Sequence, residues 1–264
     1  MAQVVGAPAP VQAARTMKLP RPLRLVFPLL IFTTLAFAGE NPPRILLAGD
    51  STMADKPLDL PERGWGMALG AFFKDSVTVQ NHAMNGRSTR SFIDEGRWQK
   101  LLDATRPGDV TIIQFGHNDE KVEDPKRGTD PATTFRDNLR RFVRETRDTG
   151  ATPILATPVA RRKFDREGKL VETHGAYPAA VRAVAIEENV ALLDLTTATN
   201  QWLQAAGDEP SKKFFMWIEP GKFEKISAGR KDDTHFVDAG AKQVAALAAG
   251  QIREQKLSLA PWLK

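Results

Sequence analysis

The sequence contains no cysteine, one tyrosine and four histidines among 264 residues. The absence of cysteine excludes disulfide bonds, thiolate metal sites and a lipid-carrying N-terminal cysteine, so stability is left to packing. At 42% hydrophobic residues, the chain is long enough to bury a large core. Any chemistry that needs an imidazole must use His82, His117, His174 or His235.

The N-terminal part of the chain has the pattern of a secretory signal peptide. A basic leader begins at Met17, an apolar run follows over 25–37, and small residues surround position 38. We predict two segments: 1–38 as N-terminal extension and signal peptide, and 39–264 as one globular domain. The alternative is a hydrophobic anchor that stays attached. Residues 1–16 lie unusually ahead of such a signal, which suggests Met17 as the true start.

The positive charge of the chain is concentrated in this predicted signal. Arg15, Lys18, Arg21 and Arg24 precede Gly39 and no acid does, so the formal charge of +5 falls by four to +1 for the remaining chain. A nearly neutral domain gives no reason to expect nucleic acid as a partner. We expect a secreted or periplasmic protein without stable membrane insertion after signal cleavage; the oligomeric state stays open.

Short apolar runs alternate with longer amphipathic segments after Pro43. The runs at 45–48, 77–79, 110–115, 153–156 and 190–193 are typical of buried parallel strands. Helical patterns occupy 65–73, 94–104, 131–149, 178–189 and 239–255, the last preceded by Asp238 as a plausible N-cap. This alternation predicts a three-layer α/β/α sandwich with a mostly parallel, flavodoxin-like central sheet.

A serine directly follows the first predicted strand, in Gly49-Asp50-Ser51-Thr52. A serine hydroxyl needs a base, and His235 is the best candidate because Asp232 precedes it by three residues and could orient its ring. Asp233 is the weaker choice for that orienting role. Each piece alone has an ordinary reading, since Gly-Asp-Ser often forms a turn or cap and Asp-x-x-His a surface turn. The Gly-x-Ser-x-Gly elbow is absent.

Two further segments follow the next strands: Asn81-His82-Ala83-Met84-Asn85-Gly86-Arg87-Ser88 and Gly116-His117-Asn118-Asp119. Together with Ser51, Asp232 and His235 they resemble the four sequence blocks of the SGNH (GDSL-type) hydrolases. The resemblance implies a catalytic triad of these three residues. It also implies an oxyanion hole built from the N–H groups of Ser51 and Gly86 and the side-chain amide of Asn118. Preorganised donors of this kind stabilise the tetrahedral intermediate of ester hydrolysis.

A narrower resemblance points to the rhamnogalacturonan acetylesterases. It rests on the run from Asn81 to Phe92, on 115–119, on 158–164 and on His174-Gly175-x-Tyr177-Pro178. It implies an acetylated polysaccharide or oligosaccharide with galacturonate carboxylates as substrate, which guanidinium groups would suit. The predicted substrate-binding residues are Arg87, Arg90, Arg161, Arg162 and His174. The alternatives are solvated charges, structural ion pairs and a packed loop histidine.

The remaining features suggest no cofactor and no metal. We expect His82 and His117 to be core or supporting groups, and the acidic residues within 119–124 to form a solvated loop rather than a calcium site. The aromatic insertion from Phe214 to Phe223 could stack on sugars or act as a packed flap. Three other functions remain open: an esterase or thioesterase for lipidic acyl groups, an O-acetyltransferase on the same serine, and a non-catalytic carbohydrate-binding protein.

Overall fold

The computed structural model describes residues 1–3, 6–7 and 41–264. Its strands are β1 (Arg44–Gly49), β2 (Glu62–Arg63), β3 (Thr78–Asn81), β4 (Val110–Gln114), β5 (Thr152–Ala156), β6 (Ala191–Leu193) and β7 (Phe236–Val237). Its α-helices are α1 (Trp65–Leu69), α2 (Thr89–Asp94), α3 (Arg97–Ala104), α4 (Thr134–Asp148), α5 (Tyr177–Glu187), α6 (Leu195–Ala206), α7 (Asp208–Ser211) and α8 (Asp238–Glu254). The predicted signal peptide lies outside the described residues. In the part that is described, no helix is long and apolar enough to cross a membrane.

Five strands form one parallel sheet in the order β3-β1-β4-β5-β6. Counted along the chain without β2, this is the 2-1-3-4-5 order of flavodoxin-like folds, which confirms the predicted fold class. The order reverses beside β1. The loops that leave the carboxyl ends of β1, β3 and β4 therefore meet at one edge, where such sheets bind ligands.

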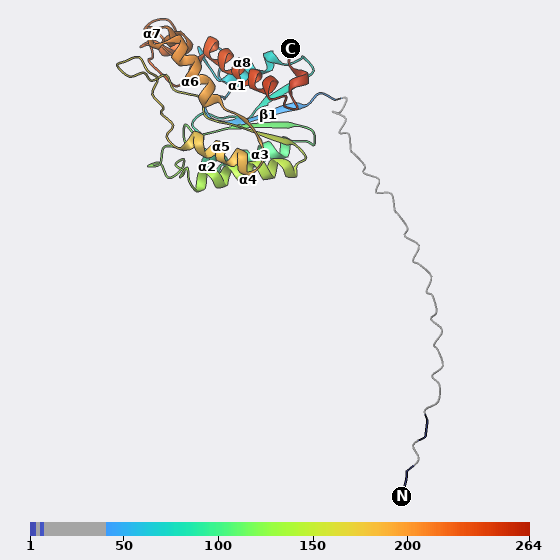
Figure 1. The fold of residues 1–264 in the computed structure, drawn as a ribbon. Helices are drawn as coiled ribbons and strands as arrows, with labels where there is room; N and C mark the ends of the chain where they lie inside the picture. Colours follow the sequence, from blue (N-terminus) through green and yellow to red (C-terminus); the bar gives the residue numbers. More distant parts are fainter. Residues whose placement is uncertain (4–5, 8–40) are drawn as a thin grey trace. The chain divides into compact units, whose positions relative to one another are not determined.

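Helices cover both faces of this sheet (Figure 1). Alternate residues of β1 supply the two cores: Ile45 and Leu47 belong to the cluster on the side of α1 and α8, and Leu46 and Ala48 to the cluster on the side of α2 to α5. All four side chains are fully buried. A strand with both faces covered must be apolar at every position, which is why its sequence shows no polar alternation.

A small antiparallel ribbon joins distant parts of the chain. In it β2 pairs with β7, with Glu62 opposite Val237 and Arg63 opposite Phe236. Helix α8 begins directly after β7 at Asp238, whose carboxylate pairs with Lys242 at 2.7 Å. The ribbon thus fixes the chain immediately before the last helix.

Three parts of the fold differ from the sequence-based expectation. Helix α6 was not expected because 195–206 contains several threonines and an asparagine, which are weak helix formers. The Asp194 side chain caps α6 by accepting a hydrogen bond from the Thr197 N–H at 3.2 Å, which is a local signal. The segment 89–104 forms two helices instead of one from 94, and the ribbon of β2 and β7 carries no periodic pattern.

Candidate active site

Ser51 lies on a tight turn at the carboxyl end of β1. The N–H groups of Met53 and Ala54 donate to the Asp50 carbonyl at 3.2 and 3.0 Å, which closes the turn. A Cβ on Gly49 would lie 2.9 Å from the Gln114 carbonyl oxygen, so only glycine fits where β1 meets β4. The turn holds the Ser51 side chain partly exposed at the edge of the sheet.

A buried polar network supports this turn. The Asp50 carboxylate accepts hydrogen bonds from the Thr52 N–H at 2.9 Å and from its hydroxyl at 2.8 Å. The Gln114 amide donates to the Thr52 hydroxyl at 3.1 Å and accepts from the Trp65 indole N–H at 2.7 Å. Complete burial raises the pKa of Asp50, although the two Thr52 donors act in the opposite direction. The serine turn is thus fixed mainly by hydrogen bonds inside the fold.

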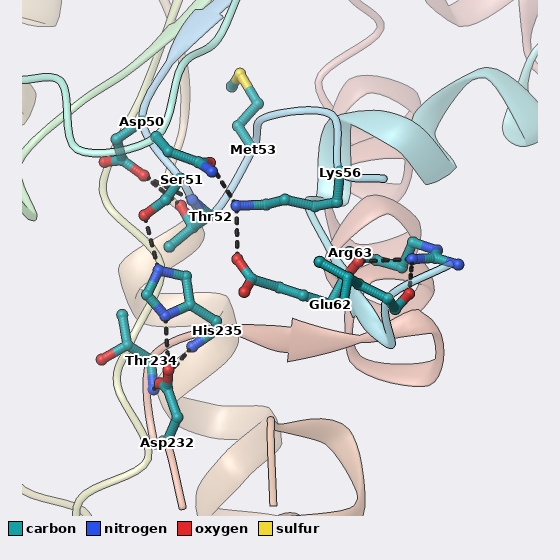
Figure 2. A network of polar contacts seen from close by, with 12 residues as sticks. Asp50, Ser51, Thr52, Met53, Lys56, Glu62, Arg63, Asp232, Thr234 and His235 are labelled. Atoms are coloured by element: carbon teal, nitrogen blue, oxygen red, sulfur yellow. Dashed lines mark hydrogen bonds and ion pairs between the residues drawn. The ribbon is translucent and has the colours of Figure 1, made fainter. Parts of the chain in front are cut away.

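His235 faces Ser51 from the chain just before β7. The Ser51 Oγ lies 2.9 Å from the His235 Nε2, and the Asp232 Oδ2 lies 2.9 Å from the His235 Nδ1 (Figure 2). Asp232 Oδ1 also accepts the N–H groups of Thr234 and His235 at 2.8 and 3.0 Å. Partial burial would raise the pKa of Asp232, but the hydrogen bonds from His235 and Thr234 hold it well below its usual value. The three side chains form the relay that serine hydrolases use to activate a hydroxyl.

The other predicted orienter, Asp233, points elsewhere. Its Oδ1 accepts from the Trp217 indole N–H at 2.7 Å and from Arg162 at 2.6 Å.

The aromatic insertion packs beside His235. Its Phe215 is 1% exposed, and the ring centroids of Phe215 and Phe236 lie 5.0 Å apart. The Met216 N–H donates to the His235 carbonyl at 2.9 Å. The buried residues Phe215 and Met216 thus support the backbone of His235 from the core side. Phe223, at the other end of the insertion, is exposed.

The predicted oxyanion donors lie beside the serine turn. The Met84 N–H donates to the Gly49 carbonyl at 3.0 Å, which ties the loop after β3 to the end of β1. Gly86 follows with φ of +76°, in a turn closed by the Arg87 N–H on the Met84 carbonyl. A Cβ there would meet no protein atom within 4 Å, so it is the left-handed backbone that favours glycine at this position. Within the described residues, the Ser51 and Gly86 N–H groups make no hydrogen bond.

Asn118 is held with its amide toward the same loop. Its Nδ2 donates to the Arg87 carbonyl at 3.1 Å, and its Oδ1 accepts from the Lys121 ammonium at 2.9 Å. The side chain is 3% exposed, and its second Nδ2–H makes no hydrogen bond among the described residues. Sequence reasoning missed Lys121, which follows Asn118 by three residues. Burial, with Arg127 and Arg161, lowers the pKa of Lys121.

Three of the predicted substrate-binding arginines are partly exposed but engaged within the protein. Arg87 pairs with Glu95 at 3.0 Å and Arg90 donates to the Pro125 carbonyl at 2.9 Å. Arg161 pairs with Glu120. The contacts of Arg87 and Arg161 match the alternative of structural ion pairs, and that of Arg90 is a hydrogen bond to the backbone. Substrate contact by these side chains stays a prediction.

Two predicted substrate contacts need correction, because Arg162 and His174 are 4% and 1% exposed. Arg162 pairs with Asp208 and Asp233, and its guanidinium lies 5.1 Å from the Trp217 ring centroid. The His174 nitrogens face Glu120 Oε2 at 3.1 Å and the Val159 carbonyl at 2.9 Å. Both side chains are thus engaged inside the protein, which matches the alternatives of a structural ion pair for Arg162 and a packed loop histidine for His174.

His117 lies directly before Asn118 and is 3% exposed, as expected for a core or supporting group. It packs edge-on against His174 with ring centroids 4.5 Å apart, and neither of its nitrogens has a partner within the described residues. Burial lowers the pKa of His117 well below its usual value, and the charges of His174 and Arg161 add to this. His82 is partly exposed at the end of β3.

The acidic loop after β4 is not simply solvated, which corrects a second expectation. Asp119 is fully buried and accepts from the Thr89 N–H at 3.0 Å and from the Thr129 hydroxyl at 3.0 Å. Burial raises the pKa of Asp119 to about 7, although these donors lower it. Within the described residues, no group of three or more His, Cys, Asp or Glu side chains gathers as a metal site would.

Comparison with known proteins matches residues 47–243 to the GDSL-like Lipase/Acylhydrolase family. The chain is 42% identical to the rhamnogalacturonan acetylesterase RhgT of Bacillus subtilis, over 83% of this chain and 94% of that one. It is 37% identical to the probable rhamnogalacturonan acetylesterase YesY of the same organism, over 81% and 94%.

Solved structures agree in fold. Protein YXIM from Bacillus subtilis superposes with a TM-score of 0.70 at 28% identity, over 82% of this chain and 58% of that one. A catalytic mutant of Axe2, an acetylxylan esterase from Geobacillus stearothermophilus, gives a TM-score of 0.56 at 20% identity, over 80% and 94%. At that identity the likeness shows the fold alone. The family match and the identity to RhgT go further: the chain belongs to the GDSL-like lipase/acylhydrolase family and is a carboxylic ester hydrolase.

Proposed function

We propose that this enzyme removes O-acetyl groups from acetylated rhamnogalacturonan through an acetyl-Ser51 intermediate. One observation carries the mechanism: Ser51 Oγ, the two His235 nitrogens and Asp232 Oδ2 form a continuous relay with both links at 2.9 Å. The substrate is supported by the likeness of this chain, over most of its length, to the rhamnogalacturonan acetylesterase RhgT and the probable rhamnogalacturonan acetylesterase YesY.

In the first half-reaction, the His235 Nε2 takes the proton as the Ser51 Oγ attacks the acetyl carbonyl carbon. The N–H groups of Ser51 and Gly86 and the Asn118 amide donate to the resulting oxyanion. The carbon–oxygen bond to the sugar then breaks, and His235 gives its proton to the sugar oxygen. In the second half-reaction, water attacks the acetyl-serine, His235 takes the proton of the water and returns it to Ser51, and acetate leaves.

Lys121 gives this site a cation for an acidic sugar. Its side chain is exposed, and its ammonium donates a hydrogen bond to the Asn118 Oδ1 at 2.9 Å. Among the described residues, no carboxylate lies within ion-pair distance of this ammonium. The partly exposed Arg87, Arg90 and Arg161 already contact Glu95, the Pro125 carbonyl and Glu120, respectively. Lys121 is therefore better placed than the predicted arginines to meet a galacturonate carboxylate next to the acetylated position.

The decisive experiment measures acetate release from acetylated rhamnogalacturonan, homogalacturonan and xylan. We expect the highest kcat/KM on rhamnogalacturonan and an acetylated Ser51 trapped by acid quench and mass spectrometry. Faster release from xylan would overturn the substrate, and the absence of acetyl-Ser51 would overturn the mechanism. A chain-length series of nitrophenyl esters tests the lipid alternative, which predicts faster cleavage of octanoate than of acetate. Acetyl transfer to added oligosaccharide that outruns hydrolysis would favour a transferase.

We also propose that the protein is exported, on the basis of the signal pattern at 17–38. N-terminal sequencing of protein recovered outside the cytoplasm tests this proposal. A mature chain that begins near Gly39 supports cleavage, whereas an N-terminus at Met17 or before it contradicts cleavage.

A further inference from the structure

A line of polar contacts, mostly between opposite charges, runs from His235 to Asn85 in the loop that carries Gly86. Figure 2 shows two parts of it, the contact of His235 with Asp232 and that of Lys56 with Glu62. Its members, in order of contact, are His235, Asp232, Arg230, Glu62, Lys56 and Asn85. They come from the chain before β7, from β2 and the turn ahead of it, and from the loop after β3. Of these six residues, only His235 and Asp232 were predicted from the sequence as site residues.

Arg230 shares one carboxylate oxygen with the histidine. Its Nη2 pairs with Asp232 Oδ2, the same atom that lies 2.9 Å from His235 Nδ1, and is itself 3.4 Å from that nitrogen. Its Nη1 donates to Glu62 Oε2 at 3.0 Å. One planar guanidinium thus contacts the triad carboxylate and a second acid at once, which a lysine ammonium does with less geometric constraint.

Glu62 and Lys56 extend the line into the protein. The Glu62 side chain is 15% exposed and that of Lys56 is 3% exposed, with Nζ 2.6 Å from Glu62 Oε1 and 2.5 Å from Asn85 Oδ1. Burial would raise the pKa of Glu62, but Lys56 and the neighbouring His235 and Arg230 charges lower it. Ionised groups this well enclosed need one another, because leaving one unpaired is costly.

We propose that Arg230 and Glu62 are positioning residues that set the ionisation of His235 by opposing charges, and that Lys56 couples them to the Gly86 turn. The inference rests on the proposed role of His235 as general base. Arg230 favours the neutral imidazole, the form that can accept a proton from Ser51. Glu62 favours the imidazolium and limits the effect of Arg230.

The charged and titratable groups around His235 come from several elements. They are Asp50 at the end of β1, Glu62 on β2, His117 after β4, and Arg230 and Asp232 before β7. Arg230 and Glu62 can be neutralised without altering the serine turn or the direct partner of the histidine. Glu62→Gln is isosteric, and Arg230→Gln keeps a shorter polar side chain.

The test is the pH profile of kcat/KM for acetate release from 4-nitrophenyl acetate, whose acid limb reports the free enzyme's base. R230Q should move the acid limb to higher pH by about one unit, because it removes a cation within a few ångströms. E62Q should move it to lower pH by about half a unit, because its charge lies one contact further away. The acid limb of the double variant R230Q/E62Q should lie between those of the two single variants, about half a unit above that of the wild type if the two effects add.

A lysine variant separates charge from geometry. R230K keeps the positive charge, so its acid limb should stay near that of the wild type while kcat falls through loss of the two-sided contact. K56M should lower kcat with a smaller upward shift than R230Q. Shifts in the same direction for R230Q and E62Q, or no shift in either, would overturn the inference; if R230Q does not fold, E62Q and R230K decide it.

Failure of the proposed function gives a different result. If the wild-type enzyme shows no acid limb, or if H235A keeps normal activity, then His235 is not the base. If the limb is present and H235A is inactive while the charge variants do not shift it in opposite directions, only the present inference fails.

Discussion

The two halves of the active site are held by different forces. Ser51 follows a fully buried strand, and the carboxylate, hydroxyl, amide and indole beneath it hydrogen-bond to one another away from water. The His235 side chain is 23% exposed. Its partner Asp232 is held by an ion pair with Arg230, which also pairs with Glu62 and is itself partly exposed. The serine half should therefore respond to changes of shape and hydrogen bonding, and the histidine half to charge, pH and salt.

The largest effect should come from the serine itself. S51A removes the nucleophile and should leave at most about 10³–10⁴-fold acceleration over water from the remaining site. Steady-state kinetics on acetylated rhamnogalacturonan and mass spectrometry of the quenched enzyme check both the rate and the absence of the acetyl adduct. Near-normal turnover would remove Ser51 from the mechanism.

The next effect tests the histidine half. D232N should lower kcat by roughly 10⁴-fold, because an amide can hold the ring in the wrong tautomer. D233N is the matched control, since Asp233 contacts Arg162 and Trp217 instead of the histidine. Comparable kcat losses in the two variants would show that charge near the loop matters more than the contact with His235.

Removing the Asn118 amide should have a smaller effect on the rate. N118A should lower kcat by about 10²–10³-fold with little change in KM, because the lost hydrogen bond forms with the oxyanion.

K121M should reduce kcat/KM on rhamnogalacturonan more than on 4-nitrophenyl acetate, which carries no carboxylate. Equal losses on both substrates would limit Lys121 to holding Asn118.

The buried network under Ser51 can be tested through stability. W65F removes the indole N–H and leaves the Gln114 oxygen buried without its donor, which should cost about 1–3 kcal/mol of unfolding free energy. W98F is the control, because the Trp98 indole donates to Glu145, whose side chain is 33% exposed and can turn to water. Urea unfolding of both variants gives the comparison, and an equal cost for W98F would contradict it.

The smallest effect concerns the pH dependence of stability. The pKa of Asp119 in the folded protein is about 7, above the ordinary value of 3.8, so the stability linked to its protonation is complete below pH 4 and is lost as the pH rises to 7. Asp232 has a lowered pKa and acts in the opposite direction, losing its contribution as the pH falls below 4. Urea unfolding at pH 4, 5.5 and 7 should show a flatter profile for D119N than for the wild type; parallel profiles would disprove the assignment.

The sequence predicted the sheet and the serine–histidine pairing because each leaves a local signal. The strands are continuous apolar runs, and only one of four histidines has an acid three residues earlier. The internal contacts of Arg162 and His174 left no local signal, because their acidic partners lie 46 and 71 residues from Arg162 and 54 residues from His174. These partners are Asp208 and Asp233 for Arg162 and Glu120 for His174.

The contacts of Arg230 were unpredictable for a related reason. Its partner Glu62 lies 168 residues away and approaches through a ribbon whose strands have two residues each. No hydrophobic period marks strands that short. Lys121 is a different case, since its distance of three residues from Asn118 is visible in the sequence but its direction depends on the turn.

The ribbon of β2 and β7 brings together two ends of the domain that hydrolysis requires. The nucleophile Ser51 follows β1, whereas the base His235 precedes β7 and the helix α8 after it, so neither half of the chain contains a complete triad. Two fragments divided between α4 and α5 should regain esterase activity only when they reassociate. The same arrangement makes this domain suitable as a split reporter, in which nitrophenol released from a nitrophenyl ester measures the reassociation of the two fragments.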